Sequence, residues 1–332
     1  MSALVVRPVE PHEMDTWDEF VANSPQGTLY HTGAWKHVVD RALGSGRLVM
    51  LGCFDELALC GGVVLLDRER FGQRTAVTPL LTPYVGFLLD SPPGEKLSDQ
   101  ISRDSAVLDA LARALMERYG YVNLINPPAL EDTRPLSNAG FVLTPRFTYL
   151  VNLRLPAEEL WMRLDGSVRR QVRKAQRGDF DISDNLDPAE GYALLESTFT
   201  RRGEACPVPR ALFEEIVESE RLRDARRVFC AHRNGRLASY ILGLRDTRCV
   251  YYAVAATDPD VLTEGVSSLL VWELMESGAA EGVSLLDFVG ANIPSIARFK
   301  EGFNPRLQIY FQAEHYSSSF LKLGKSLADM IL

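Results

Sequence analysis

Five cationic side chains fall within ten residues of a chain that is acidic overall. Residues 168–177 read VRRQVRKAQR and contain no acidic side chain. On a helix, Arg169 and Arg173 stack one turn apart, and like charges at that spacing repel unless an anion compensates them. The segment therefore predicts either a solvated helix face neutralised by acids elsewhere in the fold, or a site for the phosphates of a nucleotide diphosphate or an RNA end.

One lysine lies among aromatic residues near the end of the chain. Residues 287–303 read DFVGANIPSIARFKEGF, which predicts a strand, a turn, and a short helix that begins at Pro294. Lys300 falls between Phe299 and Phe303 on that helix. It is either an exposed lysine or a cation held at a functional site.

The elements that would position these residues occur in the same order in both halves. The N-terminal half predicts strand 3–9, helices 14–23 and 35–41, strands 47–54 and 57–66, a strand-like stretch 75–89 interrupted by prolines, helix 104–119 and strand 121–126. The C-terminal half predicts helix 157–177, strand 180–183, helices 188–202 and 210–220, strands 227–232, 237–244 and 249–256, helix 267–281 and strand 284–289. Each half reads β-α-α-β-β-β-α-β, which predicts two fused α/β domains that meet near residues 145–156.

Composition excludes several classes of function. The 332 residues include 36 Lys and Arg against 44 Asp and Glu, a net charge of −8. A dedicated binder of DNA or of an anionic membrane is normally basic, so we expect no DNA partner. No apolar run is long enough for a transmembrane segment, and the first residues lack a signal-peptide pattern, so we expect a cytoplasmic protein. The five cysteines and five histidines are scattered, which predicts reduced thiols and no metal site.

Several motifs together resemble the FemABX family. They are SPxGTxxHTxxW at 24–35, RxxRKA at 170–175, the segments 198–203 and 251–255, Trp272-Glu273, and GxNxxSIxxFKxxF at 290–303. FemABX proteins are aminoacyl-tRNA-dependent peptidyltransferases, and the resemblance extends over roughly residues 15–313. It implies an α/β (α+β) fold of two tandem GNAT-like domains, each a mixed, mostly antiparallel sheet flanked by helices. The expected domains are residues 1–150, and residues 151–332 with the Phe-Lys motif.

The resemblance also implies an activity, which needs no cofactor. The acceptor end of an aminoacyl-tRNA would donate its aminoacyl group to an amine of a small peptide, either a nucleotide-linked peptidoglycan precursor or a natural-product peptide. Phe299 and Lys300 match the pair that the family places at its reaction centre. There a lysine ammonium would stabilise the oxyanion that forms when an amine attacks an ester, and the phenylalanine rings would exclude water.

Further residues are candidates for substrate binding through the same resemblance. Arg202 resembles an arginine that holds substrate phosphate, although a cation is also favoured at a helix C-terminus. Lys36 follows the tryptophan of the first motif and is either a phosphate contact or an exposed lysine. Tyr251 and Tyr252 alternate on a strand, so one of them must face inward. The inward one, for which we take Tyr252, either resembles a site tyrosine or packs in the core. The full set of expected substrate-binding residues is Lys36, Tyr84, Arg169, Arg173, Arg202 and Tyr252.

Acyl-CoA is the alternative to aminoacyl-tRNA as the acyl donor. GNAT enzymes that use acyl-CoA cradle its pyrophosphate on a glycine-rich loop before a helix. The corresponding residues 262–267 read LTEGVS, in which Gly265 is present but Glu264 adds a negative charge. This departure argues against tight CoA binding. Two alternatives stay open: an acyl-CoA-dependent GNAT N-acyltransferase, and a catalytically inert double-GNAT module that binds a partner.

Overall fold

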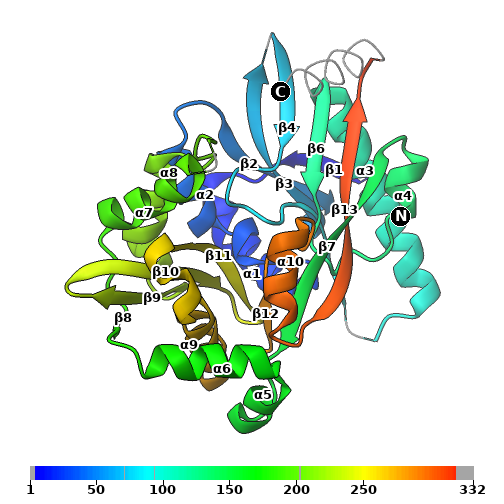
Figure 1. Ribbon diagram of the computed structural model, residues 1–332. Helices are drawn as coiled ribbons and strands as arrows, with labels where there is room; N and C mark the ends of the chain where they lie inside the picture. Colours follow the sequence, from blue (N-terminus) through cyan, green and yellow to red (C-terminus); the bar gives the residue numbers. More distant parts are fainter. Residues whose placement is uncertain (1–3, 71, 93, 202, 319–332) are drawn as a thin grey trace. The chain divides into compact units, whose positions relative to one another are not determined.

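The computed structural model describes residues 4–70, 72–92, 94–201 and 203–318 (Figure 1). These residues form two compact units. Unit 1 holds the residues up to Arg146 together with those from Ile309 onward, and unit 2 is Phe147–Gln308. Unit 1 is therefore built from two separate pieces of the chain.

Unit 1 contains a largely antiparallel sheet with helices. Its elements are β1 (Val5–Pro8), α1 (Met14–Asn23), α2 (Gly33–Ala42), β2 (Arg47–Asp55), β3 (Ala58–Arg70), β4 (Gln73–Val77), β5 (Gly86–Leu89), α3 (Leu97–Arg118), β6 (Tyr121–Ile125) and α4 (Arg134–Asn138). Strands β7 (Val142–Asn152) and β13 (Arg306–Tyr316) each have residues in both units. In unit 1 the strand order is β1-β2-β3-β4-β6-β13, with β5 paired to β3. Of these pairs only β4 and β6 run parallel.

The first motif, SPxGTxxHTxxW, has a structural role in unit 1. Thr32 caps α2 by accepting a hydrogen bond from the backbone N–H of Trp35. The indole N–H of Trp35 donates to Thr82 at 3.0 Å, and that of Trp17 donates to the carbonyl of His31 at 2.8 Å. Because both indoles are fully buried, these bonds satisfy donors that water cannot reach.

Unit 2 repeats the arrangement. Its elements are α5 (Ala157–Arg163), α6 (Gly166–Gln176), β8 (Asp181–Ser183), α7 (Pro188–Thr200), α8 (Arg210–Glu218), β9 (Arg226–Arg233), β10 (Arg236–Arg245), β11 (Cys249–Thr257), a 3₁₀ turn (Pro259–Glu264), α9 (Val266–Ala280), β12 (Leu285–Asp287) and α10 (Pro294–Glu301). The strand order is β7-β12-β11-β10-β9-β8, and only β11 and β12 run parallel.

Neighbouring residues of β10 point to opposite faces of the unit 2 sheet. The ring of Tyr240 packs against Phe213 of α8, with 6.0 Å between the ring centroids. Ile241 belongs to the apolar cluster that also contains Val172 of α6 and Leu269 of α9. Helices α7 and α8 therefore cover one face, and α6 and α9 pack together over the other. There Phe299 of α10 and Phe303, which follows that helix, also pack in the cluster.

The structure confirms the repeated order of elements and corrects two of the sequence predictions. The single helix predicted over 157–177 is two helices, because Leu164 adopts an extended conformation and buries its side chain. The stretch 75–89 is two strands, β4 and β5, separated by a segment that contains both of its prolines. The long strands β7 and β13 were not predicted.

The division into units also differs from the predicted domain ranges of 1–150 and 151–332. Residues Gln312–Tyr316 of β13 pair antiparallel with Tyr121–Ile125 of β6. This hydrogen bonding places Ile309–Ser318 in unit 1, whereas the predicted second domain includes them.

Candidate active site

The side chain of Lys300 is buried in unit 2, with 5 % of the residue exposed. Its helix, α10, begins at Pro294 as the sequence predicts. The Nζ atom donates hydrogen bonds to the carbonyl oxygens of Phe288 and Gly290, each at 2.7 Å. Among the described residues no acceptor takes its third N–H, so the ammonium has one proton left for a ligand.

The two carbonyls that hold Lys300 belong to a turn with an uncommon backbone. Val289 and Gly290, which follow β12 after Phe288, have φ angles of +52° and +92°. A β-branched residue rarely adopts a left-handed conformation, because its Cβ crowds the following peptide group. Strain of this kind persists only where the surroundings enforce it, and it clusters at functional sites.

Aromatic rings surround the ammonium. The ring centroids of Tyr252 and Phe288 lie 5.7 and 6.0 Å from Nζ. Phe303 packs against Phe288 and against Phe299, with 5.6 and 5.4 Å between centroids. The structure therefore brings Lys300, Phe299 and Tyr252 into one cluster. Tyr251 instead donates a hydrogen bond to Asp246 at 2.7 Å.

Burial sets the protonation of this cluster. It lowers the pKa of Lys300 from its ordinary value of 10.5 to about 8, while the negative charge of Asp287 acts in the opposite direction. Burial also raises the pKa of Tyr252. At neutral pH the lysine is therefore mainly an ammonium and the tyrosine a neutral phenol.

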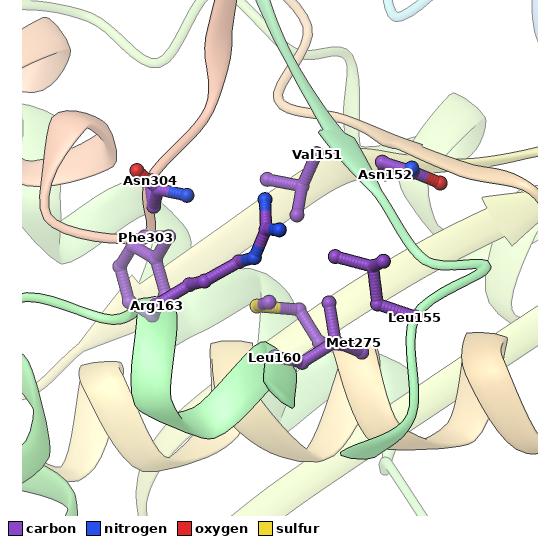
Figure 2. Close-up of a pocket in the computed structure, with 8 residues that line it drawn as sticks. All are labelled: Val151, Asn152, Leu155, Leu160, Arg163, Met275, Phe303 and Asn304. Carbon is purple, nitrogen blue, oxygen red and sulfur yellow. The ribbon is translucent and has the colours of Figure 1, made fainter. Parts of the chain in front are cut away.

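A small pocket in unit 2 shares one residue with this cluster. Figure 2 shows the side chains of Val151, Leu155, Leu160, Met275 and Phe303 around it, with Asn152, Arg163 and Asn304 adding polar groups. Arg163 also forms an ion pair with Glu159. The pocket contains no acid–base pair, and Phe303 is the residue that links it to the aromatic cluster.

The basic segment 168–177 lies on α6, and its two candidate arginines already have partners. Arg169 donates to the carbonyl oxygens of Met162 and Leu164, at 2.7 and 2.8 Å, and so caps the end of α5. The guanidinium of Arg173 lies 5.5 Å from the ring centroid of Trp161. Arg173 is exposed, so one face of its guanidinium is open to a ligand.

The remaining candidates lie elsewhere. Lys36 belongs to unit 1, where Nζ donates to Asp40 at 2.5 Å and to the carbonyl of Leu48 at 2.6 Å. Tyr84, also in unit 1, is 1 % exposed and packs edge-on against Tyr310, as a core residue does. Arg202 lies outside the described residues.

The loop that binds pyrophosphate in acyl-CoA enzymes corresponds here to the junction between β11 and α9. Helix α6 packs directly on it. A Cβ atom built on Gly265 would lie 2.3 Å from the carbonyl oxygen of Gln171, and Ser268 donates to the side chain of Gln171 at 2.6 Å. Lys174 donates to the carbonyl of Thr263 at 2.9 Å. Because Gly265, Val266 and Ser268 are buried, α6 covers the first turn of α9, where an anion would otherwise bind.

The described residues offer neither a membrane-spanning helix nor a cluster of metal ligands. None of the helices described is long and apolar enough to cross a membrane. Among the described residues, no group of three or more His, Cys, Asp or Glu side chains is placed to hold a metal ion.

Sequence reasoning missed two residues beside Lys300. Asp287 and Thr148 are buried and hydrogen-bonded to each other. Asp287 is the first residue of the 287–303 motif. A carboxylate at the end of a buried strand was a sequence signal that could have identified it as a site residue. Thr148 carried no such signal, because it lies on the unpredicted strand β7.

Comparison with known proteins agrees with this description. Residues 163–301, which include Lys300, match the acetyltransferase (GNAT) domain family. No curated protein matches the chain. The structure of FemX is similar, with a TM-score of 0.68 and 13 % identity over 92 % of this chain and 96 % of that one.

Two further solved structures share the fold at low identity. One is the C-terminal domain of a putative lysylphosphatidylglycerol synthetase from Agrobacterium fabrum, with a TM-score of 0.54 and 12 % identity over 91 % of each chain. The other is a tandem GNAT protein from the clavulanic acid biosynthesis pathway, with a TM-score of 0.53 and 13 % identity over 95 % of this chain and 99 % of that one. This chain therefore has a FemX-like acyltransferase fold that consists of two GNAT-like domains in tandem.

Proposed function

We propose that this chain transfers an aminoacyl group from the ester of a charged tRNA to an amine of a peptide or nucleotide-linked peptide. The GNAT fold supports acyl transfer, and the buried ammonium of Lys300 supplies a group suited to it. The observation that carries the choice of donor is the covered junction at Gly265. An acyl-CoA donor needs that junction for its pyrophosphate, whereas an aminoacyl ester does not.

The reaction would proceed by attack of the acceptor amine on the ester carbonyl. A C–N bond forms, the carbonyl oxygen becomes an oxyanion, and the ester C–O bond then breaks. The proton that the amine loses ends on the ribose hydroxyl that leaves. Lys300 would donate its third N–H to the oxyanion, and the low polarity that Phe299 and Tyr252 create would strengthen this interaction.

The exposed cations of α6 would contact the phosphates of the donor. Arg173 suits this role because its guanidinium is exposed beside Trp161. Arg169 would contribute mainly charge, since one of its nitrogens is already bonded to two carbonyls. Lys36 and Arg202 stay candidates for the acceptor's phosphates.

An acyl-CoA donor is the second candidate function. The match of residues 163–301 to an acetyltransferase domain favours it. Glu264 and the covered first turn of α9 oppose it, because they place a carboxylate and a packed helix where a pyrophosphate would bind.

The two donors are separated by one experiment on the purified full chain. Total tRNA charged with a mixture of radiolabelled amino acids is incubated with the protein and a panel of amines, which includes a nucleotide-linked pentapeptide. Loss of label from the tRNA is followed in parallel with thiol release from acetyl-CoA. The Lys300→Met variant serves as the reference for uncatalysed hydrolysis.

We expect label to move to an acceptor with the wild type and not with Lys300→Met. Thiol release from acetyl-CoA without transfer from tRNA would overturn the choice of donor. If the protein is inactive with both donors but one of the acceptors raises its melting temperature, the chain is a binding module instead.

A further inference from the structure

A hydrogen-bond chain behind the turn connects Lys300 to two buried polar residues. Thr148 donates from Oγ1 to Oδ1 of Asp287 at 2.5 Å. The same Oδ1 accepts the backbone N–H of Val289 at 2.8 Å, and Thr148 Oγ1 accepts the backbone N–H of Gly290 at 3.0 Å. Two of these bonds fix successive amides of the turn, and the third joins the two side chains that accept them.

Both peptide groups that bind Lys300 are held at their other end as well. The peptide between Phe288 and Val289 offers its carbonyl to Nζ and its N–H to Asp287. The peptide after Gly290 offers its carbonyl to Nζ, and its N–H, which belongs to Ala291, donates to the carbonyl of Phe147 at 2.7 Å. The left-handed Val289 is thus enforced by bonds on both sides, as a strained residue requires.

Burial gives this chain of bonds an energetic role. Thr148 is fully buried and Asp287 is 2 % exposed. A buried carboxylate is costly unless donors and a cation compensate it. Asp287 has two donors on one oxygen and is the charged group that raises the pKa of Lys300 against the effect of burial. Among the described residues, Tyr252 is the other titratable group whose ring faces the ammonium.

We propose that Asp287 and Thr148 are positioning residues for Lys300. Thr148 holds the turn in the shape that points two carbonyls at Nζ, and Asp287 both anchors Thr148 and keeps the amine protonated. The structural part of this inference stands on the geometry of the turn. Its consequence for turnover rests on the proposed function.

The structural part is tested by NMR of the lysine side chains in the full chain. The sequence contains only six lysines, so a sample labelled with ¹⁵N-lysine gives few signals, and Lys300→Met assigns the one of interest. Four variants are compared with the wild type: Asp287→Asn, Thr148→Val, Thr148→Ser and Thr75→Val. Thr75 is a matched control, because it is buried in unit 1 and donates to the carbonyl of Arg68 at 3.0 Å.

We expect Asp287→Asn to lower the pKa of Lys300 by about 1, because it removes the opposite charge. Thr148→Val should speed exchange of the Lys300 ammonium protons with water about tenfold, the change expected from the loss of roughly one hydrogen bond. Thr148→Ser should restore slow exchange, and Thr75→Val should leave it unchanged. An unchanged Lys300 signal in both Asp287→Asn and Thr148→Val would overturn the inference. If Asp287→Asn does not fold, the Lys300 signal of Thr148→Val alone decides whether the inference holds.

Turnover provides the second readout. With charged tRNA as donor, Thr148→Val should lower kcat about tenfold with little change in KM, because the oriented ammonium acts in the transition state. Asp287→Asn should move the alkaline fall in rate to lower pH. If the NMR changes occur but the wild type transfers no aminoacyl group from charged tRNA, the positioning inference holds and the proposed function fails. Transfer that neither these variants nor Lys300→Met alters would instead remove Lys300 from the reaction.

Discussion

The Nζ atom of Lys300 lies 2.7 Å from the carbonyl oxygen of Gly290, a residue ten positions earlier in the chain. Helix α10 returns over the turn from which it starts, so the lysine is held by the backbone that precedes its own helix. Burial of an ammonium costs more desolvation free energy than two hydrogen bonds to carbonyl oxygens return. These two bonds alone therefore do not explain why Lys300 is buried. We read this arrangement as a site built for charge, and four predictions follow from it and from its neighbours.

Replacement of Lys300 by methionine should slow the chemical step by roughly 10²–10³-fold, the usual effect of losing one oxyanion donor. Methionine retains most of the volume of the lysine stem between Phe299 and Phe303, so the fold should survive. Single-turnover transfer from charged tRNA measures the step. Lys96→Met, at an exposed position, is the control. A raised KM with an unaltered kcat would assign Lys300 to ground-state binding of phosphate instead.

The stability of the wild type relative to Lys300→Met should rise as pH increases from about 8 to 10.5. The pKa of Lys300 is about 8 in the folded state and 10.5 ordinarily, so the unfolded chain binds more protons than the folded chain in this range. Stability increases with pH wherever that holds. The gain should be about 3 kcal/mol over the interval. Urea unfolding of both proteins at a series of pH values measures it. A difference between them that does not change with pH would contradict the burial of the ammonium.

The two arginines of α6 should separate into one structural and one binding residue. Arg169→Gln should reduce the free energy of unfolding by about 1 kcal/mol, because the carbonyls at the end of α5 lose their donor. Arg173→Gln should change stability by less than about 0.5 kcal/mol, as is usual for an exposed residue. Its effect should appear in binding of charged tRNA, where the slope of log K against log salt should fall by about 0.7 if one phosphate contact is lost. Unaltered affinity and slope in Arg173→Gln would remove this residue from the substrate site.

Substitution of Gly265 by alanine tests the packing of α6 over α9. Gly265 has a φ of +82°, and its added Cβ would meet the carbonyl of Gln171. We expect a loss of roughly 2–4 kcal/mol, from left-handed strain and overpacking together. Gly282→Ala is the matched control, because Gly282 has a φ of +74° but open space around it. It should lose only about 1 kcal/mol. Equal losses in denaturant melts of the two variants would mean that α6 does not press on the junction in solution.

Local signals predicted most of the elements. Helix α1 has the predicted bounds, since apolar spacing starts it and Ser24-Pro25 stops it. Strand β7 was missed because Pro145 and its alternating polar residues resemble a loop, whereas its pairing with β12 is a long-range effect. The break at Leu164 was missed for a related reason. Helical periodicity continues across it, and only the hydrogen bond from Asp165 N–H to the carbonyl of Gly302, at 2.9 Å, shows why the chain turns.

The candidate site was predictable to the extent that it is local. Phe299, Lys300 and the proline that begins their helix belong to one motif, and the structure keeps them together. Thr148 and Asp287 are 139 residues apart in the chain, and no periodicity or composition links two such positions. Which carbonyls face the lysine also depends on Val289, whose left-handed conformation is rare for a β-branched residue.

The return of β13 to unit 1 bears on how this chain folds as it is synthesised. Strand β6 pairs with β4 on one side, but its second partner, β13, is synthesised only after unit 2. Asn126, which directly follows β6, bonds to the carbonyl of Phe311, 185 positions later in the chain. Until then the edge of β6 is open and able to pair with other strands. Unit 2, which is one continuous segment, has no such delay. We therefore expect unit 2 to reach its native state first during synthesis, and unit 1 to be the later and more aggregation-prone half.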